Sequence, residues 1–173
     1  MDFAELIPQK LKNKFPDTNF EVRKYRGELT ILFNKKYIVE VCKFIKTDPE
    51  LEFILCEDIT AVDWATWPAD RQGKKNRFTM VYHIFSLKNK FRIRLETDID
   101  ESDDKDRWSI DSVSSIWRTA NWQEREVYDM YGITFNNHPD LRRVYMPEEF
   151  EYYPLRKDFP LMGIPGSLPL PKK

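Results

Sequence analysis

The chain has 173 residues, enough for one domain with an extension. Its 28 Lys and Arg residues against 29 Asp and Glu residues give a formal net charge of -1, so no bulk charge draws it to nucleic acid or anionic lipid. Hydrophobic residues make up 41% and aromatic residues 14%, which predicts a hydrophobic core and a surface that binds another protein.

Two cysteines, Cys42 and Cys56, lie far apart and form no CxxC motif. We predict two buried, reduced thiols, because an iron–sulfur cluster held by this chain alone would need more thiolates. No stretch approaches the ~18 apolar residues of a membrane span. The N-terminal lysines follow the first apolar residues, the opposite order to a signal peptide. The sequence therefore predicts a soluble chain that acts where it is made.

The first part of the chain alternates between helical and strand patterns. Apolar residues at helical spacing, or at every second position, mark each element. The expected elements are a helix over 3–15 that ends before Pro16, a hairpin of strands 20–25 and 29–33 around Arg26-Gly27, and a helix along 37–45 that Asn34 caps.

Three more strands are predicted in the middle of the chain, over 53–63, 78–84 and 91–95, the last two forming a hairpin through 87–90. Charged loops are predicted over 68–76 and 100–106. The acidic second loop lacks the glycine and the terminal glutamate of a calcium loop, so we expect it to be merely solvated. The order of elements is not the strict alternation of a doubly wound sheet. It predicts an α+β fold, with a mostly antiparallel sheet and helices packed on one face.

Two helices are predicted next. A short one covers 112–120, and Asn121 caps a longer one over 122–131 that Gly132 ends. When the residues of this longer helix are projected around its axis at about 100° per residue, Glu124 and Glu126 fall inside a wide apolar arc.

The same construction leaves Arg125 and Asp129 on the narrow polar side of the longer helix. A buried carboxylate without a partner costs several kcal/mol, so Glu124 and Glu126 are expected to have cationic partners. The nearby candidates in sequence are Arg118, Arg142 and Arg143.

The same residues allow catalytic alternatives. Glu124, Glu126 and His138 could serve a stand-alone enzyme, and Glu124, Asp129 and His138 could form a facial metal triad. His138 precedes Pro139, which favours a turn, and His83 on a strand favours a packed, hydrogen-bonded histidine. No GxGxxG, Walker, GxSxG or HExxH motif occurs. These patterns favour a chain that performs no chemistry itself.

The composition changes at Pro147. Six prolines between 147 and 171 exclude a long helix or a central strand, yet ten large apolar residues accompany them. We predict a domain over 1–146 followed by an extended strap, 147–173, that docks on partner subunits. Arg156, Lys157 and Asp158 interrupt the apolar run and are expected to make ionic contacts with the partner. Such a strap should contribute little to folding of the chain itself.

Seven short segments between about Leu55 and Leu161 form one set of motifs: 58–63 (DITAVD), 116–117 (IW), 120–122 (ANW), 124–133 (EREVYDMYGI), His138, 141–144 (LRRV) and 154–160 (PLRKDFP). In identity and in order they resemble the C-type subunit of the proton-pumping NADH:quinone oxidoreductases, respiratory complex I. The first fifty residues match only in general pattern. Glu151-Tyr152-Tyr153 departs from the family, which usually has a Trp-Gly-His run here.

The resemblance implies a small α+β subunit of the peripheral arm, without catalytic residues, metal or other cofactor. It would lie on the cytoplasmic side of the cell membrane, beside the large quinone-site subunit and neighbouring iron–sulfur subunits, which carry the clusters while another subunit carries the flavin. A homologous subunit of a ferredoxin- or deazaflavin-linked dehydrogenase or of a membrane-bound hydrogenase is the alternative. The signature and interface residues are Glu124, Arg125, Glu126, Asp129, Gly132, His138, Arg142, Arg143, Arg156, Lys157 and Asp158.

Overall fold

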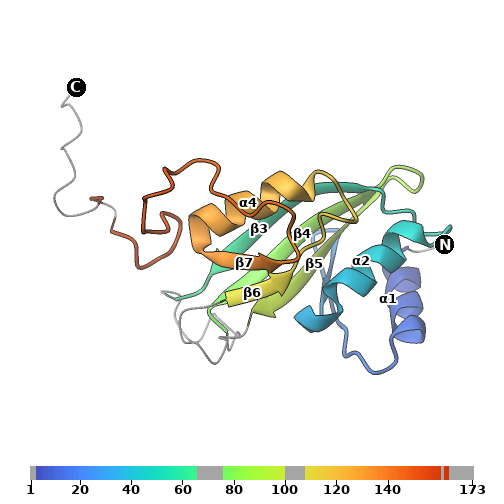
Figure 1. Cartoon of the computed structure of the whole chain (residues 1–173). Coiled ribbons are helices and arrows are strands. Elements are labelled where there is room, and N and C mark those ends of the chain that lie inside the picture. Colours follow the sequence, from blue (N-terminus) through green and yellow to red (C-terminus); the bar gives the residue numbers. More distant parts are fainter. Residues whose placement is uncertain (1–2, 66–75, 100–107, 161, 164–173) are drawn as a thin grey trace.

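Five strands form the main sheet in a computed structural model that describes residues 3–65, 76–99, 108–160 and 162–163. Their spatial order is β1-β2-β5-β4-β3, and β2 and β5 run parallel while the other neighbours run antiparallel. Figure 1 shows β3, β4 and β5 side by side. The predicted α+β fold with a mostly antiparallel sheet is confirmed. The strands are β1 (Glu21–Tyr25), β2 (Glu28–Leu32), β3 (Leu55–Asp63), β4 (Phe78–Ser86) and β5 (Phe91–Ile99).

Both predicted hairpins are present. β1 and β2 turn at Arg26 and Gly27, with φ angles of 49° and 83°, and glycine adopts such a left-handed conformation without steric cost. β4 and β5 pair in register from Phe78 opposite Ile99 to Ser86 opposite Phe91. Of the predicted charged loops, only Asn76 falls within the described residues.

The N-terminal helices begin and end close to the predicted positions. They are α1 (Phe3–Lys14), the short 3-10 helix η1 (Lys35–Tyr37) and α2 (Ile38–Thr47). Asn34 caps the η1–α2 unit, because its side-chain oxygen accepts a hydrogen bond from the Lys36 amide at 3.0 Å. Among the described residues, no helix is both long and apolar enough to span a bilayer.

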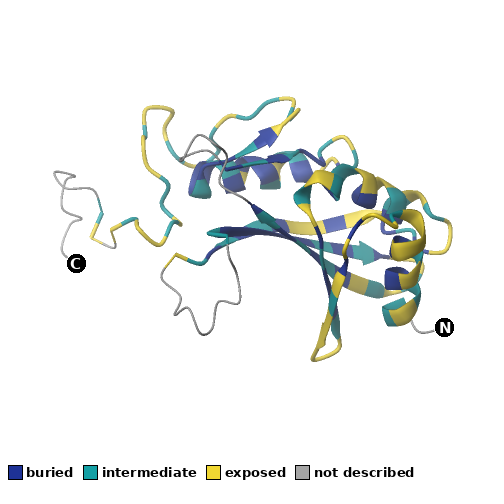
Figure 2. Ribbon diagram, turned by 90° about the horizontal axis from the view of Figure 1, so that it is seen from below, coloured by how far each residue is buried: buried dark blue, intermediate teal, exposed yellow. Residues whose placement is uncertain are grey.

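One hydrophobic cluster joins the helices to a single face of the sheet. Alternate residues of β4 are fully buried in it, and so are residues of α1 and α2. Figure 2 shows that burial concentrates in the central strands and in α4 (Ala120–Tyr131), while the edge strand β1 is largely exposed. Cys42 and Cys56 are buried and unpaired, as predicted. His83 lies on the other sheet face, where its Nε2 accepts a hydrogen bond from Arg94 at 3.0 Å.

The helix predicted over 112–120 is wrong. Turns occupy this segment. A small parallel sheet, which was not predicted, forms from β6 (Trp108–Asp111) and β7 (Ile133–Asn136). Ser112 extends this pairing by donating its amide to the Asn136 carbonyl at 2.9 Å. The Val113 amide binds the Glu124 carboxylate at 2.7 Å. These partners fix the backbone away from a helical path.

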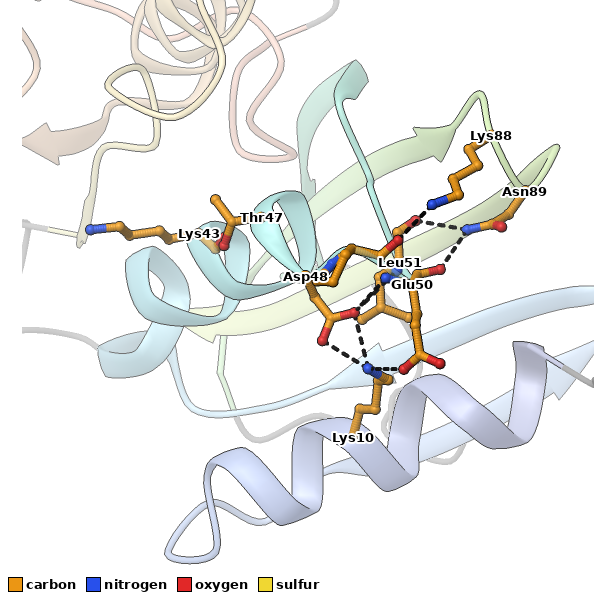
Figure 3. A network of polar contacts seen from close by, with 9 residues as sticks. Lys10, Lys43, Thr47, Asp48, Glu50, Leu51, Lys88 and Asn89 are labelled. Atoms are coloured by element: carbon orange, nitrogen blue, oxygen red, sulfur yellow. Dashed lines mark hydrogen bonds and ion pairs between the residues drawn. The ribbon is translucent and has the colours of Figure 1, made fainter.

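A polar network ties the N-terminal helices to the β4–β5 hairpin (Figure 3). Lys10 on α1 pairs with Asp48, which follows α2, and with Glu50. Lys88 in the hairpin donates to the Pro49 carbonyl at 2.7 Å and to Glu52 at 2.6 Å. The turn after α2 is thereby held from both sides, which fixes the entry into β3.

Candidate interface formed by helix α4 and the tail

The centre of the candidate interface is a buried carboxylate on α4, Asp129. Its Oδ1 accepts a hydrogen bond from the Arg143 guanidinium at 2.6 Å. Its Oδ2 accepts three backbone amides, from Val144 at 3.0 Å, Tyr145 at 2.7 Å and Met146 at 3.0 Å. Burial by itself would raise the pKa of Asp129, but these four donors outweigh it and hold the pKa below its usual value.

Asp129 was predicted on the exposed, polar side of the helix, and this is wrong. Its side chain is fully buried, as is most of Arg125. Arg125 donates to the carbonyls of Arg142 and Arg143, at 3.0 and 3.3 Å, and its guanidinium lies 4.7 Å from the Trp122 ring centre. Both residues are covered by the chain segment that follows β7.

A second buried carboxylate, Asp63 at the end of β3, binds the tail. Arg77 forms two hydrogen bonds with it, at 3.1 and 2.9 Å, and the Lys157 amide donates to Oδ2 at 2.9 Å. Burial acts to raise the pKa of Asp63, but Arg77 and the amide donors lower it overall. Asp158 completes the arrangement by pairing with Arg77 at 2.9 Å. Asp158 therefore has an ionic partner within this chain, whereas Lys157 binds Asp63 through its backbone amide.

Arg156 fastens the tail to the end of α4. Its Nε donates to the Tyr131 carbonyl at 2.6 Å, in the last helical turn, where a cation also opposes the negative end of the helix dipole. Its guanidinium lies 4.2 Å from the ring centre of Tyr153 and 4.8 Å from that of Trp108. The neighbouring Leu155 amide donates to the Met130 carbonyl at 3.1 Å.

Gly132 ends α4, as predicted, with φ at 74° and its amide bonded to the Tyr128 carbonyl. A Cβ at this position would meet the Arg156 guanidinium and would lie 2.6 Å from Cζ of Tyr153. Glycine is thus required twice, by its backbone conformation and by the tail packed over it.

Gly132→Ala is accordingly expected to lower the free energy of unfolding by more than the roughly 1–2 kcal/mol of a left-handed alanine. Gly27→Ala is the matched control, because φ there is 83° but nothing lies within 4 Å of the added Cβ. Urea denaturation of both variants measures the difference. Equal losses in the two variants would show that the tail does not press on Gly132.

Glu126 is exposed, so its predicted burial and cationic pairing are wrong. It forms no hydrogen bond or ion pair with the residues that the structure describes. Trp122, one helical turn earlier, is 62% exposed. Arg142, a proposed partner, instead pairs with the half-buried Asp140 at 2.6 Å. Trp122 and Glu126 form an open ridge on a helix that is otherwise covered on two sides.

Glu124 is fully buried, as predicted, but no arginine is its partner. Ser112 donates to its Oε2 at 2.6 Å, and His138 Nε2 lies 3.8 Å from the same oxygen. Asp129 is occupied by Arg143 and does not join them in a metal triad. Across the described ranges, no group of three or more His, Cys, Asp and Glu residues is placed to hold a metal ion. The three residues of the enzyme alternative are also divided, since Glu126 faces outward.

Large side chains remain exposed along α4 and the segment packed on it. We call the set the α4–tail surface: Trp122, Glu126, Tyr145, Tyr152 and Leu155. Tyr145 is 61% exposed and Leu155 49%. The backbone beneath them is fixed by Asp129 and by the contacts of Arg156, so these side chains are held outward on a rigid support.

Comparisons with known proteins agree on one family. Residues 31–165 match the family described as the respiratory-chain NADH dehydrogenase, 30 Kd subunit. The chain is 45% identical over 155 residues to the C-type NADH-quinone oxidoreductase subunit of Geobacter sulfurreducens, covering 89% of this chain and 88% of that one. It is 46% identical over 154 residues to the Geotalea uraniireducens protein of the same name, covering 89% and 86%.

Solved structures share the fold. A trypsin-resistant fragment (1-134) of Nqo5 superposes with a TM-score of 0.65 at 26% identity, covering 79% of this chain and 98% of that one. A chain of the archaeal membrane-bound sulfane sulfur reductase superposes with a TM-score of 0.69 at 26% identity, covering 92% and 86%. The chain therefore belongs to the 30 kDa, C-type subunit family of NADH-quinone oxidoreductase, respiratory complex I, and is a subunit of that complex.

Proposed function

We propose that the chain is a structural subunit of the peripheral arm, with no catalytic residue and no cofactor of its own. On the cytoplasmic side of the cell membrane, it holds the quinone-reducing module beside the large quinone-site subunit and neighbouring iron–sulfur subunits. Flavin and clusters belong to partner subunits. The observation that carries this proposal is the α4–tail surface, where large aromatic and apolar side chains stand exposed on a fixed backbone.

Rigidity of the support favours a docking role. Association costs the entropy of each segment that must become ordered, so a surface ordered beforehand binds with less loss. Tryptophan and tyrosine dominate the energetics of protein interfaces, because they bury large areas with few rotatable bonds. Trp122 and Tyr145 present such side chains on α4 and on the segment that Asp129 holds.

The test compares two exposed aromatic residues at different ends of the molecule. Trp122→Ala is expected to leave the unfolding free energy of the chain within about 1 kcal/mol, since the side chain is mostly in solvent, yet to reduce incorporation into the complex severalfold. Tyr25, 69% exposed in the β1–β2 hairpin, provides the control, and Tyr25→Ala should assemble normally. Affinity purification of the complex through another subunit, followed by quantification of this chain, measures the outcome.

Normal incorporation of Trp122→Ala would contradict the proposal, as would equal losses in both variants. Glu126→Ala extends the test. Because Glu126 is exposed, the unfolding free energy should change by no more than about 0.5 kcal/mol, and any defect should appear only on assembly.

The alternative of a related assembly has less support. The chain shares its fold with the sulfane sulfur reductase chain at 26% identity, against 45% identity to the Geobacter sulfurreducens subunit, in agreement with its place in NADH-quinone oxidoreductase.

A further inference from the structure

Glu124 is a buried carboxyl group without a cationic partner. Its side chain is fully shielded from solvent inside the cluster between α4 and the sheet. Two donors reach it, the Ser112 hydroxyl at 2.6 Å from Oε2 and the Val113 amide at 2.7 Å from Oε1. An isolated carboxylate in such a place is strongly disfavoured relative to its protonated form.

The one basic side chain beside it, His138, supplies no full positive charge in this geometry. Its Nδ1 accepts a hydrogen bond from the Asp140 amide at 3.0 Å, so the hydrogen of the ring lies on Nε2. Nε2 then donates to the Asn121 carbonyl at 3.0 Å, while Glu124 Oε2 lies farther away, at 3.8 Å. The ring is thus held as a neutral tautomer.

The other titratable groups facing Glu124 are acids that stay neutral at physiological pH. They are Cys42 on α2, Cys56 on β3 and Tyr82 on β4. Burial, with a contribution from the charge of Glu124, raises the pKa of Cys56 to about 12. Burial likewise raises the pKa values of Cys42 and Tyr82. No element packed against Glu124 therefore provides a counter-ion among the described residues.

A short chain of hydroxyl groups connects Glu124 to the surface. The Ser114 Oγ lies 2.7 Å from the Ser112 Oγ, which in turn donates to Glu124. Ser114 lines a surface hollow of about 470 Å³ together with Arg118, Asn121 and Trp122. Two serine hydroxyls thus bridge the distance between solvent and the buried carboxyl group.

We propose that Glu124 is a proton-binding site, loaded from this hollow through Ser114 and Ser112. When Glu124 is ionised, Ser112 donates to it and Ser114 donates to Ser112. A proton arriving from water adds to the Ser114 oxygen, the former Ser114 proton passes to Ser112, and the former Ser112 proton passes to Glu124 Oε2. Each serine again carries one hydrogen, and Glu124 has gained one.

Binding of the proton reverses the hydrogen bonds along the chain. The protonated Glu124 donates to Ser112, Ser112 donates to Ser114, and the Ser114 hydroxyl is free to donate into the hollow. The Ser114 amide continues to donate to Ser112 Oγ at 3.1 Å in both states, so the Ser112 oxygen accepts two hydrogen bonds and donates one throughout. The hollow beside Trp122 therefore gains a hydrogen-bond donor when Glu124 is protonated.

Glu124 is expected to change its protonation state near neutral pH. Burial raises the pKa of Glu124 from 4.5 to about 7, although Ser112 and the Val113 amide act in the opposite direction. Both protonation states are then populated near neutral pH.

The test is a carboxyl titration of the full-length chain by NMR with carbon-13-labelled glutamate. One side-chain carboxyl carbon is expected to titrate near neutral pH, to disappear in Glu124→Gln, and to remain in the matched control Glu126→Gln. Ser112→Ala should shift the midpoint upward, because it removes a donor to the ionised form. Ser114→Ala should shift it less but slow proton exchange.

The proposal is overturned if every glutamate carboxyl titrates with a midpoint below about pH 5.5, within the ordinary range. An unchanged or lower midpoint in Ser112→Ala overturns it as well. If Glu124→Gln does not fold, the midpoints measured for the wild-type chain and for Ser112→Ala still test the proposal. The measurement needs no partner subunit, so it stands or fails independently of the docking role.

Discussion

Asp129→Ala is expected to lower the unfolding free energy of the chain by about 3–5 kcal/mol, the range for breaking one side of a buried ion pair. The substitution removes the anionic partner of the Arg143 guanidinium, which keeps only the carbonyls of residues 129 and 152, and it leaves the three backbone amides of residues 144–146 without their acceptor. Each must find water or remain unsatisfied next to a buried helix face. The segment 143–146 should detach from α4, and assembly should fail with it.

Urea denaturation of the full-length chain, followed by circular dichroism, measures the loss. Asp140→Ala is the control, because Asp140 also pairs with an arginine, Arg142, but solvent reaches both side chains, which are 43% and 66% exposed. An exposed pair contributes at most about 1 kcal/mol. Similar losses in the two variants would mean that Asp129 does not organise the segment.

The pH dependence of stability separates Asp129 from Glu124. The folded-state pKa of Asp129 is lowered, so its contribution is present above the ordinary carboxyl pKa and is lost as pH falls through the lowered value. The folded-state pKa of Glu124 is raised to about 7, so its contribution is present below 4.5 and is lost as pH rises through about 7. Asp129→Asn should flatten the acid side of the stability curve, whereas Glu124→Gln should flatten the neutral side.

The hairpins and several helix ends could be predicted because their signals are local, although the predicted Asn121 cap of α4 is wrong, since the helix begins at Ala120. Arg26-Gly27, the Asn34 cap and Gly132 each act through neighbouring backbone groups. The parallel pairing of β6 with β7 has no such signal. Each strand has four residues, and their pairing joins segments more than twenty residues apart. Short apolar segments of this kind do not distinguish strand from helix.

Orientation of α4 could not be predicted because two surfaces cover it. Turning 100° per residue locates one apolar arc, and that arc correctly contains Glu124. The sheet covers one side of the helix, and residues 142–156 cover another, which buries Arg125 and Asp129. Trp122 and Glu126 are left outside. The polar side chains on this side of the helix are therefore buried and not exposed to solvent. The segment that covers them contacts them with a guanidinium and backbone amides, and not with apolar atoms.

The composition of the tail did not predict that the tail also packs on its own chain. Prolines and exposed apolar residues suggested a strap whose whole contact surface lies on a partner. Residues 153–158 instead bind this chain through Arg156, the Leu155 amide and the Lys157 amide. The boundary at residue 146 stays a prediction, and two truncated chains can test it.

Truncation after Met146 is expected to lower the unfolding free energy by at least about 3 kcal/mol. It removes four hydrogen bonds between the tail and the rest of the chain, at roughly 1 kcal/mol each, together with the Arg77–Asp158 ion pair and the stacking of Arg156. For a chain of this size that loss corresponds to a melting temperature lower by roughly 10 °C. The shortened chain should still fold, because the buried hydrophobic cluster extends only from Ile7 to Phe135. Truncation after Pro160 keeps every contact of Arg156, Lys157 and Asp158, and it should melt as the full chain does. An unchanged melting temperature after truncation at Met146 would instead support a strap that serves only its partners. The two shortened chains also show which part of the tail is needed for docking. If a chain ending at Pro160 assembles fully, the last thirteen residues are not required, and the α4–tail surface remains as the docking site.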